Sequence, residues 1–232
     1  MFPRTALVTG GASGIGAATV DLLRSEGAEV QSLDLASGFD VSDAQAWETV
    51  GAVELACLNA GVVTGERDVT RLSDDAYRRI LGVNLNGVVF GVRRLASVME
   101  PGGAIVATAS LAGLVPSPED PIYTLTKHAV IGFVRSVAPQ LKERGIRINA
   151  VAPGFVETPL IDTSPFTDAG FPLLQPEAVA QAVLTAARSN ETGQVWVVQP
   201  GREPLQFHFP NVPGPRDASG ASVGAPPTQL SS

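Results

Sequence analysis

The sequence of 232 residues contains little of several residue types, and each shortage excludes a class of protein. With a single cysteine, Cys57, and two histidines, it offers neither a disulfide framework nor a cysteine and histidine metal site. Lysine and arginine form no cluster and the formal net charge is -7, which argues against binding of nucleic acid or an anionic membrane surface. No apolar stretch approaches the ~20 residues that cross a bilayer. We therefore expect a cytoplasmic protein whose partners are small molecules or other subunits.

The chain is predicted to form one domain over residues 1–209, followed by a tail over residues 210–232. Hydrophobic residues make up 44% of the sequence, enough for a substantial core. In the tail, Pro, Gly and Ser account for about half of the residues and apolar periodicity disappears.

Short apolar runs alternate with longer segments of helical period, a pattern typical of parallel strands joined by helical crossovers. The expected fold is a doubly wound parallel sheet of the Rossmann type, with three α/β/α layers in a single α/β domain. We expect strands at 4–9, 29–34, 53–59, 104–109, 146–151 and 194–199, and helices at 14–25, 73–99, 121–143 and 176–189. Pro139 is expected to kink the third helix, and Cys57 is interpreted as a buried strand thiol rather than a nucleophile.

Tyr123 and Lys127 are four residues apart in the third expected helix, which places a phenol and an ammonium group on one face. The chain holds only two tyrosines and two lysines, so this pairing is unusual here. A cation one helical turn away favours the phenolate, and each unit by which it lowers the pKa corresponds to about 1.4 kcal/mol. The spacing indicates a general base, and its plain alternative is an ordinary amphipathic helix surface.

The segment 9–16 reads Thr-Gly-Gly-Ala-Ser-Gly-Ile-Gly, follows the first expected strand and leads directly into a helix. Glycines let the backbone approach a pyrophosphate closely, and the helix N-terminus presents free amide donors. Asp34 ends the next expected strand, where a carboxylate accepts hydrogen bonds from both ribose hydroxyls of adenosine and repels a 2′-phosphate. NAD is therefore expected rather than NADP. The alternatives are an ordinary glycine turn and an Asp34 that only caps a loop.

Four motifs follow one another along the chain: the glycine turn, Asp34, Asn59-Ala60-Gly61 and the Tyr123/Lys127 pair. In these motifs and their order the chain resembles the short-chain dehydrogenase/reductase family over residues 5–201. The resemblance implies that Tyr123 is the catalytic acid/base. It also implies that Lys127 binds the nicotinamide ribose and lowers the pKa of the tyrosine.

Two further catalytic residues are implied by the same resemblance. Ser110, at the end of a strand, would hold the substrate oxygen, where a hydroxyl donor stabilises the negative charge that develops. Asn84, rather than Asn86, would hold a water molecule that links Lys127 to solvent.

The cofactor site implied by the resemblance lies at the carboxyl ends of the strands, where open α/β sheets bind ligands. Asp40-Val41 resembles the adenine contact, Asn59-Ala60-Gly61 the contact with the adenosine ribose, and the loop from Pro153 to Thr158 the segment beneath the nicotinamide. The residues expected to bind NAD are Gly10, Ser13, Gly14, Ile15, Gly16, Asp34, Leu35, Asp40, Val41, Asn59, Ala60, Gly61, Tyr123, Lys127, Pro153, Gly154, Val156 and Thr158.

Two segments depart from the family pattern. Only five residues separate Asp34 from Asp40, whereas a parallel crossover needs a dozen or more. The helix between the second and third strands is therefore expected to be deleted. Any strand near Phe39 is then a stub or takes an unusual path, and the adenine pocket is more open on one wall. The segment between Thr158 and Pro176, a substrate lid in the family, also looks short. An apolar cover of Leu160, Ile161, Phe166 and Phe171 and ordinary loop packing are both open interpretations.

A homodimer or homotetramer is expected, because the third helix is apolar around much of its circumference and needs a second partner besides the sheet. Gly87 and Gly91 give the preceding helix a close-packing face, and the resemblance implies a subunit interface formed by these two helices. His128 is interpreted as structural, because it points away from the face of Lys127.

The expected function is hydride transfer between NAD(H) and a secondary alcohol or ketone, with Tyr123 assisted by Lys127, Ser110 and Asn84. The apolar residues near the expected pocket, Leu111, Leu114, Val115 and Phe155, favour a substrate with hydrocarbon character. One alternative is an NADPH-dependent 3-oxoacyl-type ketoreductase, against which Asp34 argues. The other is a non-catalytic NAD(H)-binding module, whose sign would be a degraded set of catalytic residues.

Overall fold

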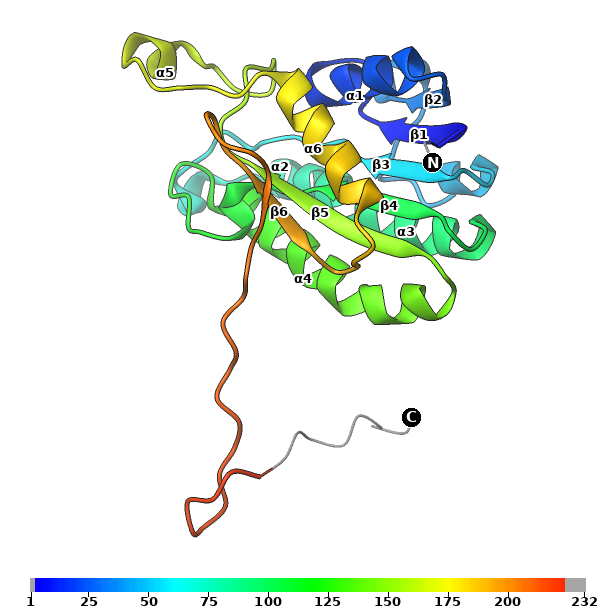
Figure 1. Cartoon of the computed structure of the whole chain (residues 1–232). Helices are drawn as coiled ribbons and strands as arrows, with labels where there is room; N and C mark the ends of the chain where they lie inside the picture. Colours follow the sequence, from blue (N-terminus) through cyan, green and yellow to red (C-terminus); the bar gives the residue numbers. More distant parts are fainter. Residues whose placement is uncertain (1–2, 224–232) are drawn as a thin grey trace.

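The computed structural model describes residues 3–223, and a seven-stranded sheet forms its centre (Figure 1). The strands lie in the order β2-β1-β3-β4-β5-β6-β7, and all neighbours are parallel except β7, which is antiparallel to β6. Their bounds are β1 (Thr5–Thr9), β2 (Glu29–Leu33), β3 (Leu55–Leu58), β4 (Ala104–Thr108), β5 (Arg147–Pro153), β6 (Val195–Val198) and β7 (Leu205–Gln206). The expected parallel α/β sheet is confirmed.

Helices cover both faces of this sheet. They are α1 (Gly14–Ser25), α2 (Asp74–Leu81), α3 (Gly87–Val98), α4 (Pro121–Glu143), α5 (Ser164–Asp168) and α6 (Pro176–Arg188). Figure 1 shows α1 and α6 on one side of the sheet and α3 and α4 on the other. Because successive side chains of a strand point to opposite faces, Ala6 and Val8 pack in the core with α1 and α6, whereas Leu7 packs in the core with α3 and α4. The three-layer arrangement is therefore confirmed.

The helix expected over 73–99 is interrupted. A π-helical turn, Gly82–Asn86, separates α2 from α3 and places Asn84 in the interior, where its side chain is 0% exposed. Such turns occur often at functional sites. The expectation of one uniform helix was wrong, because periodicity does not reveal the extra residue that a π turn inserts.

The glycine face of α3 packs within the chain. A Cβ at Gly87 would lie 2.9 Å from Cγ2 of Val41, and one at Gly91 would lie 2.7 Å from Cη2 of Trp47. The predicted close-packing face is therefore confirmed, with Val41 and Trp47 of the same chain as its partners, and the subunit interface stays a prediction.

The connection between β2 and β3 contains no α-helix. Within residues 34–54, all of them described, the regular elements are two short 3₁₀ turns, Leu35–Ser37 and Ala46–Thr49. The expected deletion is confirmed, but no strand stub forms at Phe39. The Phe39 ring instead packs edge-on against Trp47 with 5.3 Å between centroids, and Trp47 donates from Nε1 to the Val41 carbonyl at 3.0 Å. The strand β2 is therefore an edge of the sheet.

The helix α4 continues through Pro139, which lies on its exposed side. Cys57 is 2% exposed within β3, and burial raises the pKa of its thiol to about 12. The prediction of a buried strand thiol is confirmed, and a raised pKa disfavours the thiolate that a nucleophile requires.

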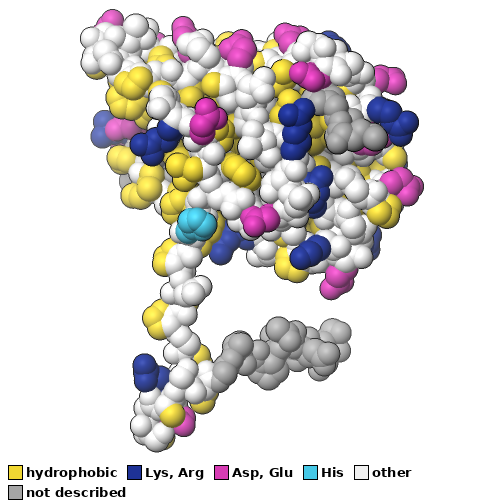
Figure 2. All heavy atoms as spheres, viewed as in Figure 1, with side chains coloured by type: hydrophobic (Ala, Val, Ile, Leu, Met, Phe, Trp, Pro, Cys, Tyr) yellow, Lys and Arg dark blue, Asp and Glu magenta, His cyan; other side chains and the backbone are white. Residues whose placement is uncertain are grey.

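After β7, the chain leaves the sheet. The Arg135 guanidinium lies 3.6 Å from the centroid of the Phe209 ring, which holds this part against α4. The segment that follows projects away from the body (Figures 1 and 2) and contains one antiparallel bridge, between Arg216 and Ser222. The last part of the expected tail, residues 224–232, lies outside the described residues.

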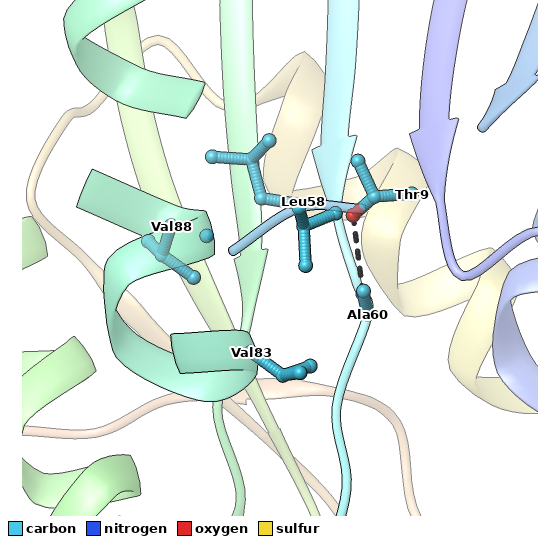
Figure 3. A pocket seen from close by; sticks show the side chains of 7 residues that line it. Thr9, Leu58, Ala60, Val83 and Val88 are labelled. Carbon is cyan, nitrogen blue, oxygen red and sulfur yellow. Dashed lines mark hydrogen bonds between the residues drawn. The ribbon is translucent and has the colours of Figure 1, made fainter. Parts of the chain in front are cut away.

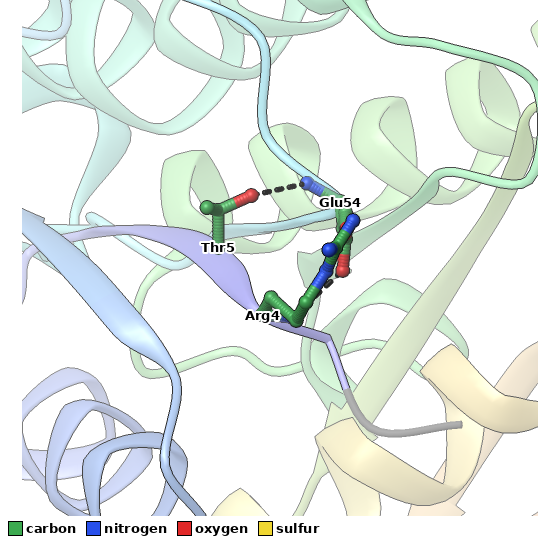
Figure 4. Close-up of polar contacts among 3 residues, drawn as sticks. All are labelled: Arg4, Thr5 and Glu54. Carbon is green, nitrogen blue, oxygen red and sulfur yellow. Dashed lines mark hydrogen bonds and ion pairs between the residues drawn. The ribbon is translucent and has the colours of Figure 1, made fainter.

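At the amino ends of the strands, Arg4 joins β1 to the residue before β3 (Figure 4). Arg4 donates from its backbone nitrogen to Oε2 of Glu54 at 2.7 Å and from Nη2 to Oε1 at 3.0 Å, and Glu54 donates from its backbone nitrogen to Oγ1 of Thr5 at 3.2 Å. These bonds from Arg4 lower the pKa of Glu54. A cavity of about 870 Å³ opens at this end, opposite the edge where parallel sheets bind ligands. Among the described residues, no helix combines the length and apolarity that a membrane crossing requires.

Candidate active site

The glycine turn between β1 and α1 is closely packed around backbone. Gly10 has φ +66°, and a Cβ at Gly16 would lie 1.9 Å from the Gly10 carbonyl oxygen, so a side chain at Gly16 has no room. Ser13 begins α1 without a side-chain cap, and the first turn contains no acidic residue. The first amides of α1 therefore receive no side-chain cap and lie at the positive end of the helix dipole, an arrangement that fits a pyrophosphate. Gly14 and Ile15 belong to this first turn.

Asp34 follows β2 and reaches back to the glycine turn. Its Oδ2 accepts a hydrogen bond from the Ala12 backbone at 3.1 Å, and its Oδ1 accepts one from the Ala36 backbone at 3.0 Å. The carboxylate thus caps the 3₁₀ turn that begins at Leu35 and also lies against the predicted phosphate site. Leu35 is 73% exposed beside it.

A narrow crevice joins the carboxyl ends of β1 and β3 to α3 (Figure 3). Oγ1 of Thr9 accepts hydrogen bonds from the backbone nitrogens of Asn59 at 2.9 Å and Ala60 at 3.1 Å. Val41 and Ala60 both line the crevice, so two predicted contacts of the adenosine meet there. Asp40 is exposed and instead caps its own turn, accepting from Ser42 at 2.8 Å.

Asn84 holds the segment after Asn59-Ala60-Gly61 by direct hydrogen bonds. Its Oδ1 accepts from the Val62 backbone nitrogen at 2.8 Å, and its Nδ2 donates to the Val62 carbonyl at 2.9 Å and to Oγ1 of Thr126 at 3.1 Å. A Cβ at Gly61 would lie 3.6 Å from both Oδ1 of Asn84 and Nζ of Lys127. The π turn, the end of β3 and α4 therefore converge at this point.

Lys127 is 3% exposed on α4, and its Nζ donates to the Thr108 carbonyl at 2.8 Å. Burial lowers the pKa of this ammonium group to about 8. The same Nζ lies 5.4 Å from the centroid of the Tyr123 ring, so the predicted pair shares one helix face as expected.

The pKa of Tyr123 differs from the sequence-based prediction. Burial raises it to about 12, a hydrogen bond with the Ser110 side chain acts in the opposite direction, and the charge of Asp120 raises it further. The prediction that Lys127 lowers this pKa is not met in the structure, because desolvation of the phenol outweighs the other influences and Lys127 is hydrogen-bonded to Thr108. Ser110 and Tyr123 are nevertheless brought together.

The loop after β5 reaches from the expected substrate side to the glycine turn. Pro153 ends β5, and a Cβ at Gly154 would lie 3.4 Å from Cδ1 of Leu111. Val156 forms a bridge with Leu174, and a Cβ at Gly14 would lie 3.0 Å from Cγ2 of Thr158. The loop thus spans the two predicted ends of the cofactor.

Three aromatic rings form a cluster above this loop. The centroids of Phe155 and Phe166 are 4.2 Å apart, and that of Phe171 is 5.9 Å from each. Phe166 and Phe171 are two of the four residues expected in an apolar cover. Their rings pack against each other and against Phe155. Leu160 is 40% exposed.

Sequence reasoning missed Asp120. It caps α4 and is 8% exposed, and its two oxygens accept hydrogen bonds from Tyr123, Thr64 and Gly65. The available signal was an aspartate directly before a proline at the start of a helix, a pattern typical of an N-cap followed by a first-turn proline.

Comparison with known proteins extends the resemblance. A sequence model of the family described as enoyl-(acyl carrier protein) reductase matches residues 39–201. The cyclohexanol dehydrogenase of Acinetobacter sp. is 34% identical, with 84% of this chain and 93% of that protein covered. The cis-4-hydroxycyclohexanecarboxylate dehydrogenase of Sinomonas cyclohexanicum is 34% identical over 78% of this chain and 87% of its own.

A short-chain dehydrogenase reductase of Arabidopsis thaliana is 32% identical, and the match covers 69% of each chain. Together with the parallel sheet and the order of the motifs, these matches identify the family. The chain belongs to the short-chain dehydrogenase/reductase family of oxidoreductases.

Proposed function

We propose that this protein is an NAD-dependent dehydrogenase that interconverts a secondary alcohol and its ketone, with Tyr123 as the general acid/base. The observation that carries the proposal is the convergence of Ser110, Tyr123 and Lys127 at the carboxyl edge of the sheet. A chain that had lost catalysis and kept only cofactor binding would have no need of this set.

The cofactor would bind along the carboxyl edge from the glycine turn to Lys127. The uncapped first amides of α1 suit its pyrophosphate, and Asp34 beside Ala12 suits an unphosphorylated adenosine ribose. When bound, NAD supplies the hydride acceptor for the alcohol carbon. Asp34 also argues against the NADPH-dependent 3-oxoacyl-type ketoreductase, because its carboxylate opposes a 2′-phosphate.

The residues of the chain handle the proton. In alcohol oxidation Ser110 donates a hydrogen bond to the substrate oxygen and Tyr123, as the phenolate, takes the hydroxyl proton. In ketone reduction Tyr123, as the neutral phenol, returns that proton to the oxygen. Lys127 would pass the proton toward solvent through a water molecule that Asn84 would hold. General acid/base catalysis of this kind contributes typically about 10²–10⁴ in rate.

The substrate class we propose is a cyclic secondary alcohol with an apolar ring. Two relatives are named for cyclohexanol and for cis-4-hydroxycyclohexanecarboxylate. The cluster of Phe155, Phe166 and Phe171 beside the loop after β5 supplies an apolar cover for such a ring.

The oligomeric state, the cellular location and the domain organisation belong to the same proposal. The enzyme acts as a homodimer or homotetramer, with the exposed side of α4 around Leu125, which is 47% exposed, as an interface. It works in the cytoplasm. Residues 1–209 form the catalytic domain and residues 210–232 a separate tail.

The test is to follow NADH fluorescence while the purified full-length protein is supplied with cyclohexanol and either NAD or NADP. The proposal predicts turnover with NAD and a kcat/KM at least tenfold lower with NADP. A preference for NADP would favour the ketoreductase alternative. Binding of NADH without turnover of any cyclic alcohol or ketone, in either direction, would favour a non-catalytic binding module.

A further inference from the structure

Asp120 has more hydrogen bonds than a helix cap requires. Its Oδ1 accepts from the Tyr123 backbone nitrogen at 2.8 Å, which is the usual capping bond to the first turn. Its Oδ2 accepts from the backbone nitrogens of Thr64 at 2.7 Å and Gly65 at 3.0 Å, more than 50 residues away in sequence. The buried carboxylate therefore joins two separate segments.

The segment held by Asp120 is also held at its other end. Asn84 bonds both backbone groups of Val62, so residues 62–65 are fixed by one side chain from the π turn and one from the start of α4. This segment follows directly on Asn59-Ala60-Gly61. A shift of Asp120 would therefore move the first turn of α4 relative to the predicted cofactor contacts.

We propose that Asp120 is a positioning residue that ties residues 62–65 to the first turn of α4 and places its carboxylate beside the tyrosine that moves the proton. The inference rests on the proposed function of Tyr123. Neither the family match nor the motif order assigns a role to this position.

The charge of Asp120 raises the pKa of Tyr123 in addition to burial. The charges of the neighbouring segments are largely compensated by ion pairs. Glu119 lies 3.8 Å from Arg67, and Glu66 lies 3.7 Å from Arg71. On α2, which packs on α4, Arg78 pairs with Asp74 and Asp75. Ser110, which is hydrogen-bonded to the phenol, is neutral, and Lys127 is the buried cation 5.4 Å from the centroid of the ring. Removal of the Asp120 charge is therefore expected to make Tyr123 more acidic.

The test uses the fact that the chain has two tyrosines. Tyr77 is 40% exposed on α2, so Tyr77→Phe gives a folded parent in which the near-ultraviolet absorbance of phenolate reports on Tyr123 without substrate or cofactor. Asp120→Asn in this parent keeps an acceptor for the Tyr123 amide and removes the charge. Glu119→Gln, one residue earlier and exposed, is the matched control for loss of one negative charge.

The phenolate is measured at about pH 11, and far-ultraviolet circular dichroism verifies the fold of each variant. We expect about two- to threefold more phenolate in Asp120→Asn than in the parent, which corresponds to a Tyr123 pKa lower by about half a unit. Glu119→Gln should match the parent. The pH profile of cyclohexanol oxidation should move to lower pH by the same amount in Asp120→Asn.

An unchanged phenolate fraction in folded Asp120→Asn would overturn the inference and leave Asp120 as a structural cap. If that variant does not fold, Asp120→Ser, which keeps a capping hydroxyl, is judged by the same criterion. Absence of dehydrogenase activity in the parent would contradict the proposed function and leave the tyrosine titration to decide the role of Asp120.

Discussion

Lys127 donates a hydrogen bond from Nζ to the Thr108 carbonyl at 2.8 Å, which ties the buried cation of α4 to the last residue of β4. The ammonium group is thereby held at the sheet, with Nζ 5.4 Å from the centroid of the Tyr123 ring. It also loses most of its contact with water, which has a cost in stability.

Lys127→Met is expected to raise the free energy of unfolding at pH 7 by about 2 kcal/mol while abolishing dehydrogenase activity. Burial lowers the pKa of Lys127 to about 8 from the ordinary 10.5, so the unfolded chain binds more protons between these values and the stability of the unmodified protein rises with pH there. The advantage of Lys127→Met should therefore shrink above pH 8. Urea unfolding at several pH values measures this. Lys142→Met, at the other and exposed lysine, should give no gain, and a gain there equal to that at Lys127 would contradict the explanation.

Asn84→Ala is expected to destabilise the protein by about 2–3 kcal/mol, because it leaves both backbone groups of Val62 without their partners inside the protein. Its turnover should fall more than its affinity for NAD. Thermal unfolding and steady-state rates measure the two effects. Asn86→Ala, two residues on and exposed, should be nearly neutral, and equal losses in the two variants would refute the role given to the π turn.

Gly16→Ala is expected to abolish NAD binding, since its Cβ would lie 1.9 Å from the Gly10 carbonyl oxygen and force the turn open. Calorimetric titration with NAD reports the loss. Gly132 lies in α4, where a Cβ would meet no heavy atom from the rest of residues 3–223 within 4 Å, so Gly132→Ala should bind NAD normally and gain about 0.5–1 kcal/mol of stability. Normal NAD affinity in Gly16→Ala would show that the cofactor lies elsewhere.

Asp34→Ser is expected to reduce the preference for NAD over NADP by at least tenfold, because it removes the charge that opposes a 2′-phosphate. Serine keeps a side-chain oxygen that can cap the 3₁₀ turn at Leu35–Ser37. The ratio of kcat/KM for the two cofactors is the measurement. A ratio unchanged from the parent would leave Asp34 only its role as a cap.

Much of the fold was predictable because strand and helix periodicity act locally. The six predicted strands correspond to β1 to β6, and the deleted crossover helix followed from the five residues between Asp34 and Asp40. The two-residue strand β7 and the π turn at Gly82–Asn86 were not predicted, since neither leaves a periodic signal. The packing of Gly91 on Trp47 depends on a contact between residues 44 positions apart, which no local pattern encodes.

For the candidate site, motif order placed the expected residues along one edge of the sheet, but the electrostatics depend on burial. The spacing of Tyr123 and Lys127 indicated a lowered tyrosine pKa, whereas desolvation and the nearby Asp120 raise it. Asp120 stood in a visible capping pattern, yet its bonds to Thr64 and Gly65 arise only from the tertiary fold.

The central claim is that Tyr123 moves the proton in alcohol oxidation. The most direct measurement compares the initial rate of NADH formation from cyclohexanol in Tyr123→Phe and Tyr77→Phe, with NADH binding followed by fluorescence in both. The account predicts a loss of about 10²–10⁴ in kcat for Tyr123→Phe, unchanged NADH affinity, and a normal rate for Tyr77→Phe. A Tyr123→Phe rate within tenfold of the unmodified protein would contradict it.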